Sequence, residues 1–532
     1  MSSISNSFDA IPQEILEHIA YQIASETFLG PPSNIIPFVT TNRWTYSCLS
    51  VSSNTCLYAR IFEDKFDTLP AIRRIGTHRL SAGILSGELK RRCMYLKRIR
   101  SRLDACTDEE FNVRDEEMLR EVLNYAYLLM LENEGKNERQ LKEYAQIDIW
   151  LKDYWFHEFG ASGVKRSIAS DGWPTENGNL VLAMWLYWFL LKPGDADAET
   201  YRREDQGSWR AVDVLKVFAL GAHTYFLSSP SWTDFIPPSE MYGSDISEVT
   251  YFSDRTRFRP PPLAVPAILS FITLVSQLQD QTDYSTPFTT LETSAPKRFG
   301  SMEWEREWGR CHSLGQQSSD KFVADSFTPG SLEGVWEGLF TYTEFTAYAA
   351  LLQGAPPQLL QRSLVVRHRQ TWKLREHHLI PSDSSRSDSD IGLEDGDSVE
   401  PLSAGDPLRS YFPTGTYIRE HSWGIEVREP HKELLEYRRA APGTSKSSVV
   451  DIIITGEGHS AWGQFSLVGR IRACDGFISL SKDYIDGDRG KWLYRGYLVG
   501  NVNGNLAGRW RDTLSPVDVP GYEGCFTMSR RR

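Results

Sequence analysis

The spacing of hydrophobic residues changes near residue 330 and divides the chain into a helical part and a sheet part. Before that point, apolar residues recur at steps of three and four, as the buried face of an α-helix requires. Val122, Leu123, Ala126, Leu129 and Met130 follow this spacing. We therefore expect two or more short helices within residues 8–67, and longer helices at residues 116–132, 140–156, 180–191, 211–225 and 264–278.

After residue 330 the apolar positions alternate with polar ones, which is typical of strands with one buried face. Phe465, Leu467 and Ile471 show this alternation. Asp475-Gly476 and Asn503-Gly504 supply the residue pairs that tight hairpin turns favour. The expected strands lie at residues 334–342, 345–352, 364–374, 417–427, 434–440, 449–455, 465–471, 477–484, 492–500, 506–511 and 524–528.

Consecutive hairpins in this number usually close into a barrel, because closure removes the unpaired strand edges. The expected fold class is therefore α+β and multidomain, with helices first and an antiparallel β-barrel at the C-terminal end. Gly334-Val335-Trp336 at the first strand, with Arg530 to Arg532 after the last, resembles the lipocalin-like barrels, in which a tryptophan near the base packs against a cation from the closing strand. The alternative is that Trp336 only fills the barrel end, since small barrels are normally filled by side chains.

Residues 382–406 interrupt the predicted strands. They consist mainly of Ser, Asp, Glu and Gly, and hold almost nothing that could be buried. We expect this stretch to be a disordered surface loop of the barrel domain.

Composition and charge narrow the class of protein. The chain has 532 residues, and single cores stop growing near ~250–300 residues, so two or three domains are expected. The net charge of −12 argues against a nucleic-acid partner. The scattered cysteines form no CxxC pair and residues 1–12 do not form a secretory signal, which predicts an intracellular protein, cytoplasmic and/or nuclear. The longest apolar run, at residues 180–191, is shorter than the ~20 residues that cross a bilayer, so no membrane partner is expected.

The N-terminal segment carries the most specific motif. Ile11, Ile15, Ile19 and Ile23 step by four residues and form an apolar stripe on a helix. The runs Ile11-Pro12-Gln13-Glu14-Ile15-Leu16, Cys48-Leu49-Ser50 and Leu57-Tyr58-Ala59-Arg60-Ile61-Phe62 resemble the F-box of basidiomycete (mushroom-type) fungal proteins, with Ile11 in place of the usual Leu. Residues 131–137, 184–189 and 490–497 are similar to the same group.

This resemblance implies a three-helix F-box that binds a Skp-type adaptor and, through it, a cullin. The chain is then a non-catalytic, cofactor-free substrate receptor of an SCF-type (Skp, cullin, F-box) ubiquitin ligase for an unidentified protein substrate. Its implied domains are the F-box at residues 1–67, a helical linker module at 68–325 and the barrel at 326–532. The alternative is a small-molecule-binding β-barrel protein with a degenerate F-box. The implied adaptor-binding residues are Ile11, Pro12, Ile15, Leu16 and Ile19, with Leu57 and Ile61 as weaker candidates.

If the F-box is occupied by the adaptor, another surface must bind the cargo. Loops on a rigid β scaffold often bind partners, and aromatic rings and arginines are frequent anchors. The expected cargo-binding residues are Trp462, Trp492, Tyr494, Arg495, Tyr497, Arg509, Trp510 and Arg511.

Two kinds of chemistry receive little support from the sequence. The segment Gly458-His459-Ser460-Ala461-Trp462-Gly463 differs from a nucleophile elbow because its second glycine comes one residue late, so a hydrolase centred on Ser460 is a remote alternative. No zinc-ligand spacing accompanies the adjacent pairs His377-His378 and Cys311-His312, so we expect no metal site.

Overall fold

The computed structural model describes residues 11–107, 115–191, 211–227, 247–280, 304–315, 323, 326–363, 365–380, 411–413, 415–440, 448–473, 475–487, 489–500, 504–515 and 519–531. The predicted loop at residues 382–406 lies outside these ranges. The chain forms two compact units. The first comprises Met1–Arg166, Glu248–Thr256 and Arg298–Glu305, and the second comprises Ser167–Ser247, Arg257–Lys297 and Arg306–Arg532. This division does not coincide with the predicted boundaries at residues 67 and 325.

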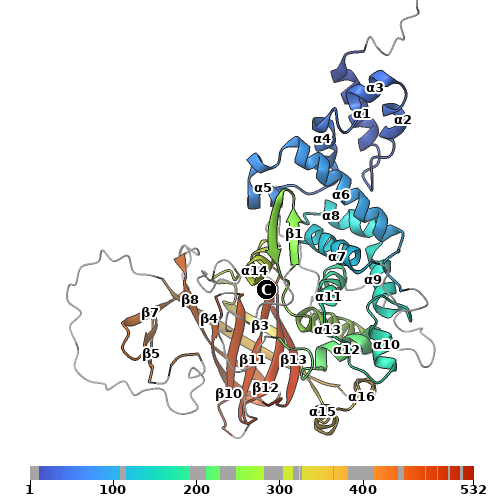
Figure 1. The fold of residues 1–532 in the computed structure, drawn as a ribbon. Coiled ribbons are helices and arrows are strands. Elements are labelled where there is room, and N and C mark those ends of the chain that lie inside the picture. Colours follow the sequence, from blue (N-terminus) through green and yellow to red (C-terminus); the bar gives the residue numbers. More distant parts are fainter. Residues whose placement is uncertain are drawn as a thin grey trace, which may run out of the picture. The chain divides into compact units, whose positions relative to one another are not determined.

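The first unit begins with a group of short helices, as the sequence predicts (Figure 1). Pro12 precedes α1, where its missing N–H leaves no helical hydrogen bond unmade. Asn42 forms a capping box with Thr45 at the start of α3, and the Asn54 side chain accepts the Leu57 N–H at the start of α4. The helices are α1 (Gln13–Ser25), α2 (Ile35–Val39), α3 (Arg43–Leu49), α4 (Thr55–Lys65), α5 (Leu69–Ile75) and the 3-10 turn η2 (Thr77–Arg79).

Longer helices complete this unit: α6 (Ala82–Arg100), α7 (Glu116–Leu131), α8 (Lys136–Arg139), the π-helical turn η3 (Gln140–Tyr144) and α9 (Ile147–Phe156). The predicted helix at residues 140–156 is broken at Gln146, whose φ of 55° is left-handed. The Asp67 carboxylate anchors α8, because it accepts the backbone N–H groups of Glu134 (2.8 Å), Lys136 (3.1 Å) and Asn137 (3.0 Å). A hairpin of β1 (Ser247–Tyr251) and β2 (Asp254–Phe258) was not predicted.

Five further helices precede the sheet in the described part of the chain: α10 (Val164–Ala169), α11 (Gly178–Leu190), α12 (Ala211–Leu220), α13 (Ala264–Asp280) and α14 (Glu305–Gly315). Apart from the first residues of α10 and α14, they belong to the second unit. α13 packs against α11 and α12, and α12 and α13 lie beside the outer face of the last strands (Figure 1). Among the described helices, none combines the length and apolar character that a membrane span needs.

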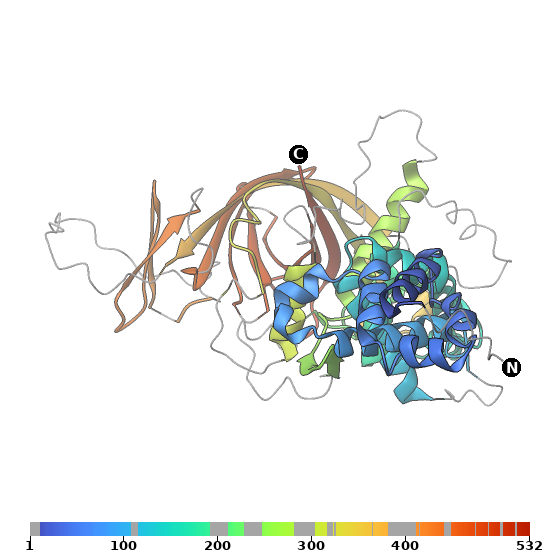
Figure 2. The same cartoon turned by 90° about the horizontal axis from the view of Figure 1, so that it is seen from above.

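Eight antiparallel strands of the second unit close into a barrel, which confirms the predicted closed sheet (Figure 2). Each strand pairs with the next strand of the barrel, and the last strand returns to the first through the pairing of Phe526 with Phe340. The strands are β3 (Gly334–Thr343), β4 (Val365–Leu379), β8 (Asp451–Ser460), β9 (Gly463–Ile471), β10 (Phe477–Tyr484), β11 (Lys491–Val499), β12 (Asn505–Asp512) and β13 (Glu523–Arg530).

The long strand β4 belongs to two ladders. One edge pairs with β8, while the other pairs with β3 up to Leu374 and with β7 from His377 onward. β7 (Leu434–Arg439) is the last strand of an inserted meander with β5 (Tyr417–His421) and β6 (Gly424–Arg428). The predicted single strand at residues 417–427 is therefore a hairpin.

The predicted strand at residues 345–352 is wrong, because this segment is the helix α15 (Phe345–Leu352), followed by α16 (Gln358–Arg362). Its buried residues, Tyr348 and Leu351, are three positions apart and share a helical face. Three alanines in this short run also favour a helix over a strand.

Large aromatic rings and glycines alternate on the inward face of the barrel. Trp336, Trp372 and Phe526 are fully buried there. A Cβ added to Gly524 would lie 2.6 Å from the ring of Trp510, so glycine leaves the room that this ring occupies. The inward glycines are Gly338, Gly456, Gly458, Gly469, Gly496, Gly508 and Gly524.

One end of the barrel is filled by the segment that precedes β3. Its Gly330 and Leu332 N–H groups each lie 2.6 Å from the Glu376 carboxylate, which accepts both hydrogen bonds. The Trp336 indole donates to the Leu332 carbonyl at 2.8 Å. Arg530 lies opposite Trp336 on β13, and its guanidinium donates to the carbonyl of Glu333.

Candidate functional site

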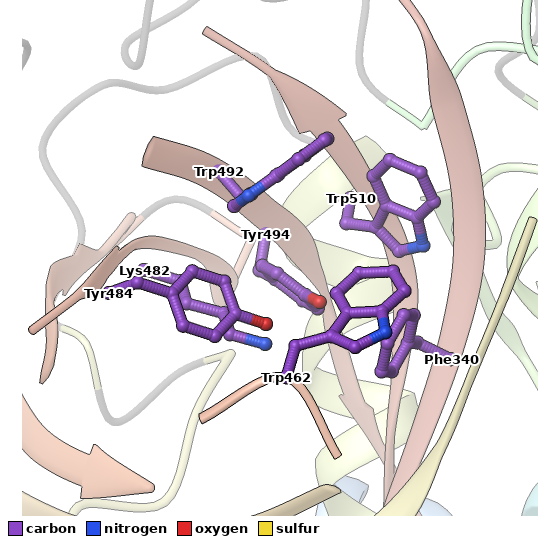
Figure 3. Close-up of a pocket in the computed structure, with 7 residues that line it drawn as sticks. All are labelled: Phe340, Trp462, Lys482, Tyr484, Trp492, Tyr494 and Trp510. Carbon is purple, nitrogen blue, oxygen red and sulfur yellow. The ribbon is translucent and has the colours of Figure 1, made fainter. Parts of the chain in front are cut away.

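The other end of the barrel holds a small hollow that opens to solvent and has room for about one water molecule. Its walls come from five strand or turn segments: β3, the turn between β8 and β9, β10, β11 and β12. The enclosed space is far smaller than the roughly 300–1,000 Å³ that is usual for ligand sites. The lining residues are Phe340, Trp462, Lys482, Tyr484, Trp492, Tyr494 and Trp510 (Figure 3).

Lys482 is the one cation among these lining residues. It lies on β10 at an inward position, in phase with Ile478, Leu480 and Tyr484, and is 1% exposed. In the barrel ladder it lies opposite Leu467 on β9 and Trp492 on β11. The strand pairing therefore directs an ammonium group into the apolar interior.

The Lys482 amino group is surrounded mainly by aromatic rings. Its Nζ lies 3.9 Å from the ring centroid of Phe465, 4.8 Å from that of Tyr484, and 5.3 Å from those of Phe340 and Tyr494. It donates one hydrogen bond, at 3.3 Å, to the side-chain carbonyl of Gln370. In the part of the chain that the structure describes, no carboxylate forms an ion pair with Lys482.

Burial without a carboxylate partner lowers the pKa of Lys482 to about 7. Desolvation penalises the ammonium form, and ring faces compensate for only part of this cost. Both the ammonium and the neutral amine are therefore populated at neutral pH.

Hydroxyl groups face the same space. The hydroxyls of Tyr484 and Tyr494 and the amino group of Lys482 point toward one another (Figure 3). Burial raises the pKa of both phenols, that of Tyr494 strongly, so both keep their protons at neutral pH. The Tyr484 hydroxyl lies 3.2 Å from Ser460 Oγ.

Three tryptophans form the wider walls of the cavity. Trp462 packs edge-to-face on Phe340 at a centroid distance of 5.1 Å and also contacts the His368 ring at 5.1 Å. Trp492 and Trp510 pack edge-to-face at 5.2 Å. The Trp510 indole donates to the Thr341 carbonyl at 3.0 Å, which fixes its ring plane.

The structure brings together four of the eight predicted cargo-binding residues, because Trp462, Trp492, Tyr494 and Trp510 all line this cavity. The other four occupy the outward phase of β11 and β12, yet they are also buried. Arg509 donates to the carbonyls of Phe218 (2.9 Å) and Ala219 (3.2 Å) at the end of α12.

The remaining three outward residues form hydrogen bonds within the sheet and its turns. Tyr497 donates to Asp475 at 2.7 Å, Arg495 donates to Ser479 Oγ at 3.1 Å, and Arg511 donates to the carbonyl of Val519. The expectation that Arg495, Tyr497, Arg509 and Arg511 present a cargo surface is therefore corrected: their side chains are buried, Arg509 against the end of α12 and the other three within the sheet and its turns.

Lys482, Phe340 and Tyr484 were not predicted as site residues. The sequence did carry one signal for Lys482, since it falls on the apolar phase of the strand between Leu480 and Tyr484. A charged residue on that phase must enter the barrel, where ionisable groups are rare.

The residues of the remote hydrolase alternative do not assemble. Ser460 Oγ contacts the Tyr484 hydroxyl and the Trp462 N–H. Asp451 lies at the opposite end of β8, where its carboxylate accepts hydrogen bonds from Arg470 and Tyr437. His459 neighbours Ser460 on the same strand, so the two side chains point to opposite faces.

The predicted adaptor-binding residues separate into exposed and buried groups. Ile15 is 51% exposed and Ile19 is 37% exposed, Pro12 is exposed, and Ile11 is half-buried. Leu16, Leu57 and Ile61 are buried in the core of the first unit, so their expected contact with a partner is corrected. They are buried because α1 packs on α4 through these positions.

Further exposed apolar side chains follow on the next two helices. Ile36 on α2 is 58% exposed, and Trp44 and Tyr46 on α3 are 40% and 56% exposed. Sequence reasoning missed these three. Together with Ile15 and Ile19 they make the first three helices unusually apolar on the outside.

Comparison with known proteins gives no relative, because no protein-family model matches the chain and no match is found among curated proteins or solved structures. Among the described residues, no group of three or more His, Cys, Asp or Glu side chains could hold a metal ion.

Proposed function

We propose that the chain is a substrate receptor of an SCF-type ubiquitin ligase, in which α1 to α3 bind a Skp-type adaptor and, through it, a cullin. The observation that carries this proposal is the exposure of Ile15, Ile19, Ile36, Trp44 and Tyr46 within one short group of helices. Scattered single apolar residues are normal on a protein surface, but several within 32 positions of sequence (15 to 46) favour a protein interface.

The chemistry of this surface suits a helical partner. Ile15 and Ile19 are one helical turn apart, so they lie on the same face of α1 and can enter one apolar groove. Aromatic residues are enriched in interface cores, and Trp44 and Tyr46 supply them.

Adaptor binding can be tested with Ile15→Asp combined with Ile19→Asp. Each change places a carboxylate where an apolar contact should form, at a cost of about 2 kcal/mol or more per site. The control is Leu352→Asp combined with Leu434→Asp, which adds the same charge at apolar residues that are 38% and 43% exposed in the second unit.

Capture of a purified Skp adaptor by the full chain is the measurement. We expect the wild type and the control to bind and the Ile15/Ile19 variant to lose binding by at least about ten-fold. Adaptor binding that survives in the Ile15/Ile19 variant, or that the wild type itself lacks, would overturn the proposal.

We further infer that the barrel is lipocalin-like. The up-and-down order of its strands supports this, as does the pairing of Trp336 on the first strand with Arg530 on the last. In the receptor, the cargo is a protein, and its contacts would be with Trp462 and Trp492, which are half-buried at the open barrel end.

A further inference from the structure

We infer that the open end of the barrel binds cargo through an apolar segment of the cargo that is flanked by basic residues. This inference rests on the proposed receptor function and deepens it, because it names the class of cargo. It is carried by exposed apolar side chains and by carboxylates on α15 and on the turns after β10 and β12. We call the apolar side chains the apolar rim: Phe345, Leu352, Ile485, Leu514 and Val519.

The apolar rim holds five of the nine large apolar side chains that are exposed in the described part of the second unit. The other four are Phe226, Tyr417, Trp423 and Leu434. Within the rim, Leu514 is 93% exposed, Ile485 is 67% exposed and Phe345 is 66% exposed. Single exposed apolar residues are normal, but their concentration at one end of the barrel indicates an interaction surface.

The outward face of α15 is apolar. Phe345, Ala349 and Leu352 follow the spacing of four and three residues that defines one helical face, while Tyr348 and Leu351 are buried on the other side. The helix contains no charged residue. A surface helix normally carries charged or polar residues on its outer face, so the apolar face of α15 indicates that another chain covers it.

Direct contacts join the segments that carry the apolar rim. The Thr513 hydroxyl donates to the Lys491 carbonyl at 2.9 Å, which holds the turn after β12 beside the end of the turn after β10. The Phe345 ring lies 5.6 Å from the ring of Tyr522, which directly precedes β13. Figure 1 shows α15 at the same end of the barrel as these turns. The apolar rim is therefore one surface around the open end.

The hollow inside the apolar rim is too small to admit a side chain, since it has room for about one water molecule. The rings of Trp492 and Trp510 fill it on one side, where their centroids are 5.2 Å apart. A partner therefore lies across the rim and does not enter the barrel. It would cover the rim together with the half-buried Trp462 and Trp492, and apolar residues of the partner gain most from this contact.

The charges beside the apolar rim select the flanks of this segment. In the described part of the two turns and at the residue before α15, carboxylates without an ion pair outnumber such cations by three to one. The carboxylates are Glu344, Asp486 and Asp512, and the cation is Arg489. Lys491 is already paired with Asp483 at 3.3 Å. Because complementary charges set which partner binds, the segment should carry lysine or arginine beside its apolar residues.

A lipid bilayer is the competing partner for an apolar surface. The exposed carboxylates of Glu344, next to Phe345, and Asp486, next to Ile485, oppose it, because surfaces with anionic lipids repel acidic groups. A peptide can instead place a basic side chain opposite each carboxylate. The charges therefore favour a protein segment over a lipid surface.

The test is the fluorescence anisotropy of labelled synthetic peptides titrated with the full chain. The first peptide has a core of leucine, isoleucine and phenylalanine flanked by lysines. The second has the same core flanked by glutamates, and the third has a serine core flanked by lysines. We expect the first peptide to bind at least about ten-fold more tightly than either of the others, because only it matches both the rim and its charges.

The apolar contact is tested with Ile485→Ser combined with Leu514→Ser, which should weaken binding of the first peptide by at least about ten-fold. The control is Met94→Ser combined with Leu434→Ser, at apolar side chains that are 48% and 43% exposed elsewhere, and it should bind as the wild type. All four residues are exposed, so the melting temperature should stay almost unchanged in both variants.

The charge contact is tested with Glu344→Gln combined with Asp486→Asn. This variant should reduce the preference for lysine flanks over glutamate flanks to less than about three-fold. The control is Glu420→Gln combined with Glu433→Gln, which removes two exposed carboxylates of the meander segment and should keep the full preference.

Equal affinity for the first and third peptides, or binding of the first peptide that survives in the Ile485/Leu514 variant, would overturn the inference. Sedimentation of the wild type with vesicles of phosphatidylcholine and phosphatidylserine, lost in the same variant, would assign the apolar rim to a lipid surface instead. A chain that captures the adaptor but binds none of the peptides refutes only the cargo class. A chain that binds the first peptide but captures no adaptor refutes only the receptor function.

Discussion

The Lys482 ammonium lies 3.9 Å from the ring centroid of Phe465, which is the next inward residue on β9 from Leu467, the direct ladder partner of Lys482. A cation over an aromatic face gains about 0.5–2 kcal/mol, which is less than the cost of removing an ammonium from water. The barrel therefore keeps a charged side chain in its core at a net loss of stability.

The first prediction concerns this loss. Burial lowers the pKa of Lys482 to about 7 in the folded chain, whereas an unfolded lysine has a pKa near ~10.4. Between these two pKa values the unfolded chain binds more protons than the folded chain, so the free energy of unfolding rises with pH. Below about pH 7 the folded chain carries the full free-energy cost of burying the charged amine. Lys482→Met should be more stable than the wild type by a few kcal/mol at a pH of about 6.5, and this advantage should shrink by about 2 kcal/mol by a pH of about 8.5.

Urea denaturation of both chains at the two pH values measures this difference. Lys373→Met serves as the control, because its exposed ammonium is solvated in both states. A stability difference between the wild type and Lys482→Met that does not change with pH would contradict the lowered pKa.

The second prediction separates two neighbouring residues of α1. Leu16 is 0% exposed and Ile15 is 51% exposed. Leu16→Ala should cost about 2–4 kcal/mol of unfolding free energy, because it leaves a cavity in the helical core. Ile15→Ala should cost less than about 1 kcal/mol. Thermal denaturation compares them, and equal costs would contradict the orientation of α1.

The third prediction concerns the loop before α8. Asp67→Ala leaves three backbone N–H groups without their acceptor, and should destabilise the first unit by about 1–3 kcal/mol. Glu63→Ala on α4 removes an exposed carboxylate and should leave the melting temperature almost unchanged. A similar effect of the two variants would show that Asp67 does not anchor α8.

The fourth prediction concerns the inward glycines. In Gly458→Ala the new methyl group meets the ring of Phe465 and lies 2.5 Å from the Thr371 carbonyl, so the barrel should lose about 1–3 kcal/mol. Gly83→Ala in α6 is the matched control, since nothing lies within 4 Å of its added Cβ. That variant should gain about 0.5–1 kcal/mol from the higher helix propensity of alanine, and chemical denaturation should show opposite signs for the two changes.

The period of the hydrophobic residues was enough to predict the helices and most strands of this fold, because burial on one face leaves a direct mark on the sequence. It failed at residues 345–352, where apolar residues are frequent enough to fit either period. It also could not show that α12 and α13 belong with the barrel. That association depends on contacts between distant residues, such as Arg509 and the end of α12, which leave no local pattern.

The candidate site was predicted in part. Composition alone pointed to the C-terminal tryptophans, but it could not separate the inward Trp510 from the outward Arg509 and Arg511 until the register of β12 was known. A shift of one residue reverses the facing of every side chain on a strand. Similarly, the spacing of four residues identified Ile15 and Ile19, while the burial of Leu16 depends on how α1 meets α4.

Closure of the barrel through β3 and β13 sets the order of events during synthesis. Phe340 pairs with Phe526, so the two partners are 186 positions apart in the chain. At a translation rate of about 5–20 residues per second, β3 leaves the ribosome roughly 10 to 40 s before β13. During that time the free edges of β3 and β12 can pair with strands of other chains. Protection of these two edges on the ribosome should therefore determine how much of the nascent protein reaches its folded state.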